Sequence, residues 1–351
     1  MEPLWLTELA AAAVRAPSAD NSQPWVLQWN GSVLDLTFRQ RGIKQSVFAA
    51  GSHATLLSVG AVMEHLRVAL VANGMQPDWR WPSDPAVGLP YVSLPIASTS
   101  TTFVRPDALF QRHTNRGPYH STPLPNDIAY ELQKFQDNRT RVVLVVEGSK
   151  KAALVRLARY CSEARFCSQP LHEWLIGSLR FTPEAVERGD GLDVDALCLP
   201  PGARQFLRFT SDWRRLAFLN RLGVYKLLAL SEVALLAAGP ALLCVIGRTD
   251  ARSILDAGIL LSRAWTYLNG RGIAVHPYYV VPDQINRAHD GSIAHGFEAK
   301  IAAVETELRP LLALQAGESL HMMLRLGYAK TTPVYSRRLP LDSVLINHTA
   351  T

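Results

Sequence analysis

The sequence lacks the short signatures of several widespread catalytic and nucleotide-binding sites. It contains no G-x-G-x-x-G, no Walker loop, no H-E-x-x-H and no G-x-S-x-G. These absences argue against a Rossmann dinucleotide site, a P-loop, a zincin and a serine hydrolase. Cysteine is also scarce, and none of its positions shows C-x-x-C spacing or histidines at metal-ligand intervals: Cys161, Cys167, Cys198 and Cys244. We therefore expect reduced, structural thiols and no metal site.

Charged residues are few, at 19% of the chain, and the net charge of +6 is mild for 351 residues. The basic residues are scattered, without a basic arm or a basic stripe interleaved with aromatics, so we expect no nucleic-acid partner. The balance is compatible with an anionic small molecule. With 48% hydrophobic residues the chain is of globular composition.

Long apolar runs are interrupted. The most apolar segment, residues 227–246, contains Glu232 and is broken at Gly239-Pro240, which predicts a helix followed by a buried strand. A spanning helix needs about 20 uninterrupted apolar residues, so we expect no transmembrane segment, while peripheral membrane contact stays open. The N-terminus lacks the basic and apolar regions of a signal peptide, which favours a cytoplasmic protein.

A polar segment joins the first predicted helix to the first predicted strand. Apolar residues at i, i+3, i+4, i+7 and i+8 from Leu6 predict a helix that starts near Pro3, and Pro17 stops it. Residues 18–23 offer short polar side chains, and residues 24–29 restart an extended segment that ends at an Asn-Gly hairpin turn. On composition alone, the segment is either an ordinary helix end with a turn or a loop that binds a ligand.

The string Pro-Ser-x-x-Asn-x-Gln-Pro-Trp, residues 17–25, resembles the flavin-contacting loop of the nitroreductase superfamily. Members of that family are FMN-dependent oxidoreductases with an α+β fold, and their site lies at a dimer interface. The resemblance implies that Pro17, Ser18 and Asn21 contact a flavin, while the end of the loop braces it.

Arg112-x-Thr114-x-Arg116 resembles the family's second motif, Arg-x-Ser-x-Arg or Lys, which holds the flavin from the other subunit. Two guanidinium groups and a hydroxyl in a short extended segment can converge on one phosphate. The resemblance implies that Arg112 and Thr114 take the phosphate and ribityl chain, and that Arg116 lies near N1 and the C2 carbonyl of the flavin. In isolation, the same segment is typical of a solvated basic turn.

Two further segments resemble parts of the same site. His276-Pro277-Tyr278 is similar to the segment whose backbone approaches flavin N5. His276 is a candidate proton donor, although a lone histidine near an apolar strand is more often structural. The pair Arg337-Arg338 resembles the basic tail that completes the phosphate site, with Arg338 as the expected ligand and Arg337 as the alternate.

An internal repeat predicts two related halves. Residues 57–75 and 255–273 superpose without a gap, with Gly60 on Gly258, so a buried helix with a close-packed glycine occurs twice. Because the identity is low, chance similarity is the alternative. Each half carries one of the two flavin motifs, which implies one complete site per chain.

The length of the chain also suits two halves of ordinary size. We place the boundary at the polar run 97–102, which gives a first half over residues 1–102 and a second half over residues 103–351. An insertion at about 150–236 is too rich in predicted helix for a linker and is expected to form a lid over the site.

Together these features predict an α+β protein of two fused nitroreductase-like halves, with antiparallel-rich sheets flanked by helices, that forms a pseudo-dimer. The tandem-half Acg-like subgroup is the most similar one. The resemblance implies one non-covalent FMN, with hydride transfer through flavin N5 by a ping-pong sequence between NAD(P)H and a small organic acceptor. The reverse direction, oxidation of a small biosynthetic intermediate, is equally compatible.

Other functions remain open at this point. The chain could bind or sequester FMN beneath its lid with little turnover, or serve as a partner-binding module whose site has decayed. The pseudo-dimer could act as a monomer or as a homodimer of such chains.

Overall fold

The computed structural model of the chain describes residues 3–41, 47–82, 90–96, 102–146 and 148–349. Its helices are α1 Leu4–Ala13, α2 His53–Ala72, α3 Asp107–Gln111, α4 Ile128–Gln133, α5 Gly148–Phe166, α6 Gln169–Ser178, α7 Pro183–Glu187, α8 Ala203–Phe209, α9 Trp213–Arg221, α10 Val224–Ala238, α11 Ala251–Gly270, α12 Val280–His289 and α13 Glu298–Leu311, with short 3-10 turns at Ala19–Asn21, Val194–Leu197 and Leu341–Ser343. Its strands are β1 Trp25–Trp29, β2 Val33–Phe38, β3 Val92–Pro95, β4 Tyr119–His120, β5 Thr140–Val145, β6 Leu179–Arg180, β7 Leu192–Asp193, β8 Ala241–Arg248, β9 Ala274–Tyr278, β10 Glu318–Ala329 and β11 Leu345–Asn347.

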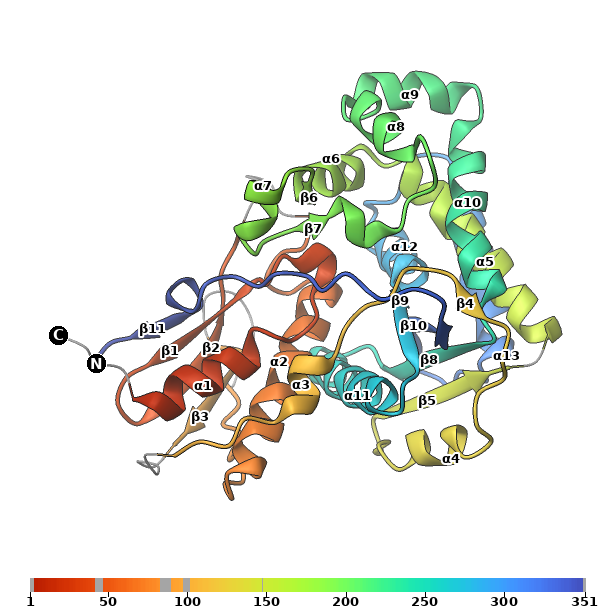
Figure 1. Cartoon of the computed structure of the whole chain (residues 1–351). Coiled ribbons are helices and arrows are strands. Elements are labelled where there is room, and N and C mark those ends of the chain that lie inside the picture. The colour runs from red at the N-terminus through yellow and green to blue at the C-terminus, as the bar shows by residue number, and fades with distance from the viewer. Residues whose placement is uncertain (1–2, 42–46, 83–89, 97–101, 147, 350–351) are drawn as a thin grey trace.

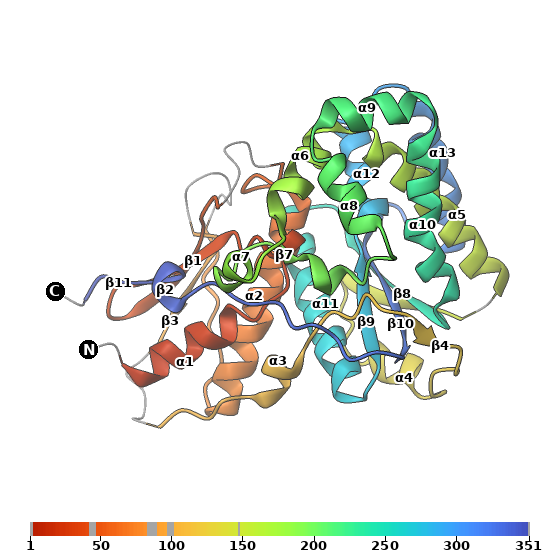
Figure 2. The ribbon, with the colours of Figure 1, turned by 45° about the horizontal axis from the view of Figure 1, so that its top comes forward.

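Sheets and helices alternate in layers (Figures 1 and 2). One sheet has the order β11-β1-β2-β3, and a second has β4-β10-β8-β5 with β9 also paired to β10. Helices α1, α2 and α11 fill the space between the sheets, and α5, α10, α12 and α13 cover the outer face of the second sheet. The fold is therefore mixed α+β with antiparallel-rich sheets, as the sequence predicts.

The central strand of the second sheet explains why its sequence is apolar without a break. In β8, Leu243 and Val245 face the core between the sheets, whereas Leu242 and Cys244 face the outer helices. A strand that is buried on both faces needs apolar residues at successive positions. The predicted break at Gly239-Pro240 separates α10 from this strand.

Helices α2 and α11 cross at two glycines, and the contact is reciprocal. A Cβ on Gly60 would lie 2.0 Å from the Leu255 carbonyl oxygen, and a Cβ on Gly258 would lie 2.2 Å from the Leu57 carbonyl oxygen. The residue pairs are those that superpose in the sequence repeat, Leu57 on Leu255 and Gly60 on Gly258. Such reciprocity is what a twofold axis between two equivalent helices produces. The chain is thus a pseudo-dimer of two fused halves.

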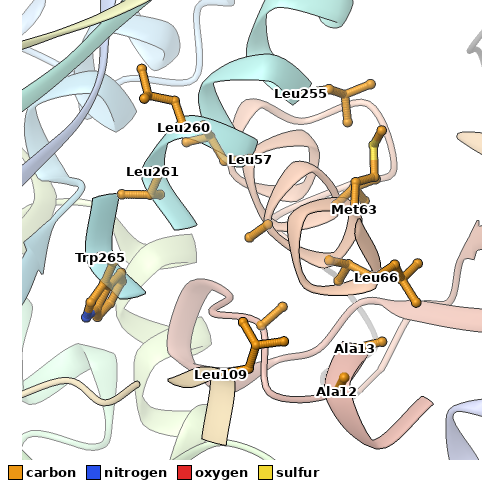
Figure 3. Packing of buried hydrophobic residues seen from close by; sticks show 14 of the residues in the cluster. Ala12, Ala13, Leu57, Met63, Leu66, Leu109, Leu255, Leu260, Leu261 and Trp265 are labelled. Carbon is orange, nitrogen blue, oxygen red and sulfur yellow. The ribbon is translucent and has the colours of Figure 1, made fainter. Parts of the chain in front are cut away.

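A single apolar core spans both halves around this crossing. Figure 3 shows Leu57 and Met63 of α2 in the same cluster as Leu260 and Trp265 of α11. Helix α2 is also the one described helix that is long and apolar enough to cross a membrane, but 83% of its most apolar window is buried inside the protein. Its composition suits the centre of a core equally well.

The predicted hairpin, β1 and β2, has the expected bounds, whereas other elements differ. α1 ends at Ala13 rather than at Pro17, because residues 14–16 already turn. Within the insertion, α8 ends at Phe209, and α9 begins at Trp213, where the Asp212 side chain accepts the Arg214 amide.

The predicted lid is smaller than the insertion. Its first and last helices, α5 and α10, pack against each other and against the second sheet, where Leu157 and Leu236 are fully buried. Only α6 to α9, with the small pair β6 and β7, lies outside that core, and this segment is called the lid below. The proposed boundary at 97–102 lies almost entirely outside the described residues.

The C-terminal strand does not stay in the second half. β11 pairs in parallel with β1, with Leu345 beside Leu27. The tail that carries Arg338 therefore crosses from the second sheet to the first (Figure 1). This crossing brings the basic tail back to the loop at residues 17–25.

Candidate functional site

The loop that follows α1 has an unusual backbone. Asp20, Asn21 and Gln23 all have positive φ, at 47°, 57° and 48°. Asp and Asn tolerate the left-handed region because their short side chains bond locally, but Gln rarely adopts it. The Ser18 Oγ accepts the Gln23 amide at 3.0 Å. Strain of this kind persists where surrounding contacts impose it, often at functional sites.

The contacts that impose it come from the lid and the tail. The Gln23 side-chain amide donates to the Gly189 carbonyl at 2.9 Å, and its oxygen accepts the Leu339 amide at 3.1 Å. A Cβ on Gly189 would lie 2.0 Å from the Arg338 carbonyl oxygen, so only glycine fits between loop and tail. The loop, the lid and the tail thus meet at Gly189.

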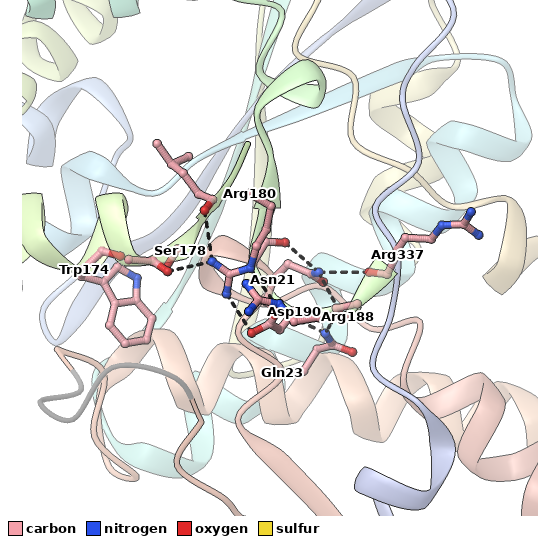
Figure 4. Close-up of polar contacts among 12 residues, drawn as sticks. Asn21, Gln23, Trp174, Ser178, Arg180, Arg188, Asp190 and Arg337 are labelled. Carbon is pink, nitrogen blue, oxygen red and sulfur yellow. Dashed lines mark hydrogen bonds and ion pairs between the residues drawn. The ribbon is translucent and has the colours of Figure 1, made fainter. Parts of the chain in front are cut away.

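Asn21 is the centre of this junction (Figure 4). Its amide nitrogen lies within hydrogen-bond distance of three carbonyl oxygens, those of Gly189 (3.2 Å), Gly191 (2.9 Å) and Arg337 (3.0 Å). Its oxygen accepts from Arg338. Both ends of the Asn21 side chain are therefore occupied by the protein itself.

Three arginines converge beside the loop without an acidic partner among the described residues. Arg112 Nη2 and Arg338 Nη2 both donate to the Arg15 carbonyl oxygen, at 2.9 and 3.3 Å. Arg112 also lies over the Trp265 ring, 4.7 Å from its centroid. Four buried N–H groups of the cluster make no hydrogen bond within the described chain: Arg15 Nε, Arg112 Nε, Arg112 Nη1 and Arg338 Nε.

The electrostatics of this arginine cluster are unfavourable on their own. Burial, with Arg15 nearby, lowers the pKa of Arg112 to about 9. Burial and the other two guanidiniums hold the pKa of Arg338 well below its usual range. The four unpaired N–H donors and the shared positive charge are what one phosphate group would satisfy, so the donor set fits a phosphate.

A buried histidine adjoins the cluster. His65 Nδ1 donates to the Ala12 carbonyl at 2.9 Å, and its Nε2 has no partner among the described residues. Burial, together with the positive charge of Arg112, lowers the pKa of His65 to about 3. The imidazole is therefore neutral and adds no further positive charge.

The remaining residues of the Arg-x-Thr-x-Arg motif are uncommitted. The Thr114 hydroxyl makes no hydrogen bond with a described residue, and the Arg116 guanidinium makes neither a hydrogen bond nor an ion pair there. Burial lowers the pKa of Arg116, and nearby Asp20 opposes that shift. Asp20 accepts from Trp174 Nε1 of the lid at 2.9 Å, and burial raises its pKa.

β9 contributes the segment with His276. Its Nδ1 is buried without a partner in the described chain, and burial next to Arg116 holds its pKa well below the usual range. The Tyr278 hydroxyl donates to the Glu232 carbonyl at 3.3 Å, so its proton is already used. Pro277 is half-buried beside them.

The two arginines of the tail diverge. Arg338 points into the arginine cluster, whereas the exposed Arg337 side chain pairs with Glu187 of the lid at 2.8 Å. The structure thus brings together Pro17, Ser18, Asn21, Arg112 and Arg338. It leaves the Arg337 guanidinium outside.

Sequence reasoning missed Arg15 and His65, which lie in predicted helices and carry no motif. The helical spacing of apolar residues shows which side of α1 and of α2 is buried. It does not show that Arg15, after α1, and His65, on α2, lie close to Arg112. It also missed Arg325 on β10, which is fully buried and donates to the Gly117 carbonyl at 2.7 Å. Only its position within an apolar strand signals burial.

A second polar region was also missed. A cavity of about 280 Å³ lies between the start of α2 and α12. Tyr279 donates to His53 Nδ1 (2.8 Å), His53 Nε2 to His321 Nδ1 (2.7 Å), and His321 Nε2 to the Arg248 carbonyl (3.0 Å). Burial lowers the pKa of both imidazoles, so both are neutral, and because a carbonyl only accepts, their tautomers are fixed. Burial lowers the pKa of His321 to about 4. This hydrogen-bonded chain ties the first half to the second.

No family model matches the chain. The "Uncharacterized protein MT1398" of Mycobacterium tuberculosis (strain CDC 1551 / Oshkosh) is 25% identical over 350 residues, which is 96% of this chain and 48% of that protein. The "Putative NAD(P)H nitroreductase acg" of the same strain is 34% identical over 171 residues, 47% of this chain and 50% of that protein. About half of this chain is thus similar to a protein named as a nitroreductase. The chain spans about half the length of these curated relatives.

Solved nitroreductase structures are also similar, at a greater distance. A nitroreductase with bound FMN from Bacteroides fragilis NCTC 9343 has a TM-score of 0.36 and 11% identity, over 67% of this chain and 92% of that one.

Proposed function

We propose that the chain is an FMN-dependent oxidoreductase of the nitroreductase type. The observation that carries the proposal is the cluster of Arg15, Arg112 and Arg338, whose four buried N–H groups have no partner within the described chain. A charge cluster of this kind is costly unless an anion pairs with it. The FMN phosphate is the anion that the two resemblance motifs and the nitroreductase-like relative favour.

Most of the predicted residues have a place in this proposal. Arg112 and Arg338 bind the phosphate, together with Arg15, and Ser18 and Thr114 have hydroxyls free to donate. Pro17 packs at the start of the loop. Asn21 holds Arg338 in position rather than contacting the flavin, since both ends of its side chain bond to protein.

When bound, FMN supplies hydride transfer, by a ping-pong sequence, between NAD(P)H and a small organic acceptor or from a biosynthetic intermediate that is oxidised. The chain positions and tunes the cofactor. Arg116, which has no ion pair in the described chain, supplies positive charge beside His276. Because the His276 imidazole is neutral, it can accept or donate a hydrogen bond there, but it is not a reservoir of protons near pH 7.

The proposal includes one FMN per chain. His65 and Trp265 lie beside the arginine cluster. In the pseudo-twofold relation, Arg263 is the counterpart of His65, and Arg67 is the counterpart of Trp265. There, however, the buried Glu64 carboxylate accepts from Arg67 at 2.7 Å and from Arg263 at 3.0 Å. An internal carboxylate neutralises the second position, which supports a single anion site. The pseudo-dimer then acts as a monomer or as a homodimer of such chains.

A specific observation favours a second candidate function, FMN storage beneath an occluding lid. The junction at Gly189 ties the lid to both the loop and the tail, and the ion pair between Arg337 and Glu187 adds a further tie. A lid held this firmly would slow the exchange of NAD(P)H and acceptor.

The first test is titration of the ligand-free protein with FMN, followed by flavin fluorescence. We expect saturation at one FMN per chain. Arg338→Ala should weaken affinity about 10- to 100-fold, since charge-assisted hydrogen bonds contribute about 1.5–3 kcal/mol. The adjacent Arg337→Ala is the matched control and should leave affinity unchanged. No FMN binding, or equal loss in both variants, would overturn the proposed site.

The second test separates enzyme from storage protein. Anaerobic addition of NADH or NADPH to the FMN-loaded protein should bleach the flavin absorbance within seconds to minutes if the chain is a reductase. Persistent yellow colour, with bleaching restored by proteolytic removal of the lid, would favour storage.

A further inference from the structure

We propose that helices α8, α9 and α10 form a docking surface for a bilayer that contains anionic lipid. The inference does not depend on FMN. It rests on a cluster of exposed apolar side chains, on unpaired positive charge around them, and on the position of the three helices.

Exposed apolar residues are concentrated on these helices. Of the twelve large apolar side chains exposed in the described chain, five lie between residues 209 and 230. Their exposed fractions run from 47% to 71%: Phe209, Phe218, Leu222, Leu227 and Leu230. Single exposed apolar residues are normal, but a cluster marks a surface that binds something.

Most positive charges of the same helices have no acidic partner among the described residues, and the exception is Arg204 of α8, which pairs with Asp195 at 3.3 Å. Five basic side chains make no ion pair with any described residue: Arg208, Arg214, Arg215, Arg221 and Lys226. Asp212 is the one acidic residue of the sequence between 203 and 231, and its side chain accepts the Arg214 amide to begin α9. The surface is therefore strongly basic, whereas the chain as a whole carries only +6.

Each of the two longer helices presents its exposed apolar residues on one side. On α9, Arg214, Phe218 and Leu222 lie four residues apart, which puts them on one side of the helix. On α10, Leu227 and Leu230 are three residues apart and are likewise on one side. Gly223, at φ 88°, makes the sharp turn between the helices. Figure 1 shows α8, α9 and the start of α10 at one extremity of the molecule, away from both sheets.

An anionic bilayer explains both features, whereas a second copy of this chain explains only one. Two copies that meet at this surface would bring together ten unpaired positive charges in a closing interface, which is unfavourable. At a bilayer, Phe and Leu enter the acyl boundary while Arg and Lys side chains extend to the headgroups. Each basic residue near an anionic surface strengthens binding about five-fold.

The test is sedimentation of the full-length protein with two kinds of vesicle, pure phosphatidylcholine and a mixture in which one third is phosphatidylglycerol. We expect binding to the mixed vesicles alone, and release at high salt. Phe218→Asp/Leu222→Asp should lower the partition coefficient at least 100-fold, and Arg221→Glu at least five-fold. Tyr130→Asp, at an equally exposed position on α4, is the matched control for the apolar change.

Lys330→Glu, an exposed position outside the surface, is the control for the charge change. Because all these side chains are exposed, circular dichroism and thermal melting should be unchanged. Absence of binding to mixed vesicles, or equal binding by the wild type and the double variant, would overturn the proposal. Two other results would also overturn it, if the wild type does not bind vesicles. One is a concentration-dependent dimer that the double variant no longer forms, and the other is an RNA complex that the double variant no longer forms.

Discussion

Replacing Arg112 by methionine should stabilise the ligand-free protein while removing its response to phosphate. Lowering the pKa of a guanidinium from 12.5 to about 9 corresponds to roughly 5 kcal/mol of unfavourable free energy for the charge in the folded state. Arg112→Met removes that term and loses the stacking on Trp265 and the bond to the Arg15 carbonyl, about 1–3 kcal/mol together. We therefore expect the free energy of unfolding to rise by about 2–4 kcal/mol.

The assay is urea unfolding of wild type and variant, with and without phosphate or FMN. Wild type should gain stability with either ligand, and Arg112→Met should gain none. Arg141→Met is the matched control, because Arg141 is paired with Glu318 at 2.8 Å and its loss should destabilise. If Arg112→Met unfolds more easily than wild type and still responds to phosphate, the cluster is not an anion site.

Three further predictions concern the helix crossing, the loop and a histidine. Gly258→Ala should lower the free energy of unfolding in urea by about 2–4 kcal/mol, because its Cβ would lie 2.2 Å from the Leu57 carbonyl oxygen. Gly270→Ala meets nothing within 4 Å and should leave stability unchanged, so equal effects of the two variants would contradict the crossing. Asn21→Ala removes three contacts to lid and tail, so limited trypsin digestion should cleave the lid about ten-fold faster, and unchanged cleavage would show that the junction does not hold it. His65 stays neutral in the folded protein but takes up a proton in the unfolded chain below about pH 6.5. As the pH is lowered from 6.5 to 3, the free energy of unfolding should therefore fall by up to about 1.4 kcal/mol per pH unit. His65→Gln should flatten that slope, and a variant whose slope is parallel to that of the wild type would refute the prediction.

Local sequence patterns predicted the helices and strands better than they predicted the contacts between them. The hairpin around Asn30-Gly31 follows from turn chemistry and strand periodicity, and both are local properties of the chain. The crossing of α2 and α11 was accessible because a repeat with Gly60 on Gly258 records a close approach in the residue type itself. The end of the first helix was missed because residues 14–16 already turn before Pro17, and no residue type among them marks that end.

The rest of the site depends on contacts between distant segments. The Arg15 carbonyl oxygen accepts from Arg112 and Arg338, which lie 97 and 323 residues further along the sequence. No spacing rule within α1 distinguishes it from a surface arginine. Likewise, Asn21 matched a flavin-contact motif, yet its side chain bonds to the lid and the tail, whose approach no local pattern encodes.

The parallel pairing of β11 with β1 has a consequence for how the protein is made. The first sheet is synthesised within the first hundred residues, but the strand at its edge comes from residues 345–347. During translation that edge stays unpaired until residues 345–347 have left the ribosome. Arg338 lies in the same C-terminal segment and joins the arginine cluster only after that segment has been synthesised. The repulsive charges are therefore assembled after the residues of both apolar cores have been synthesised.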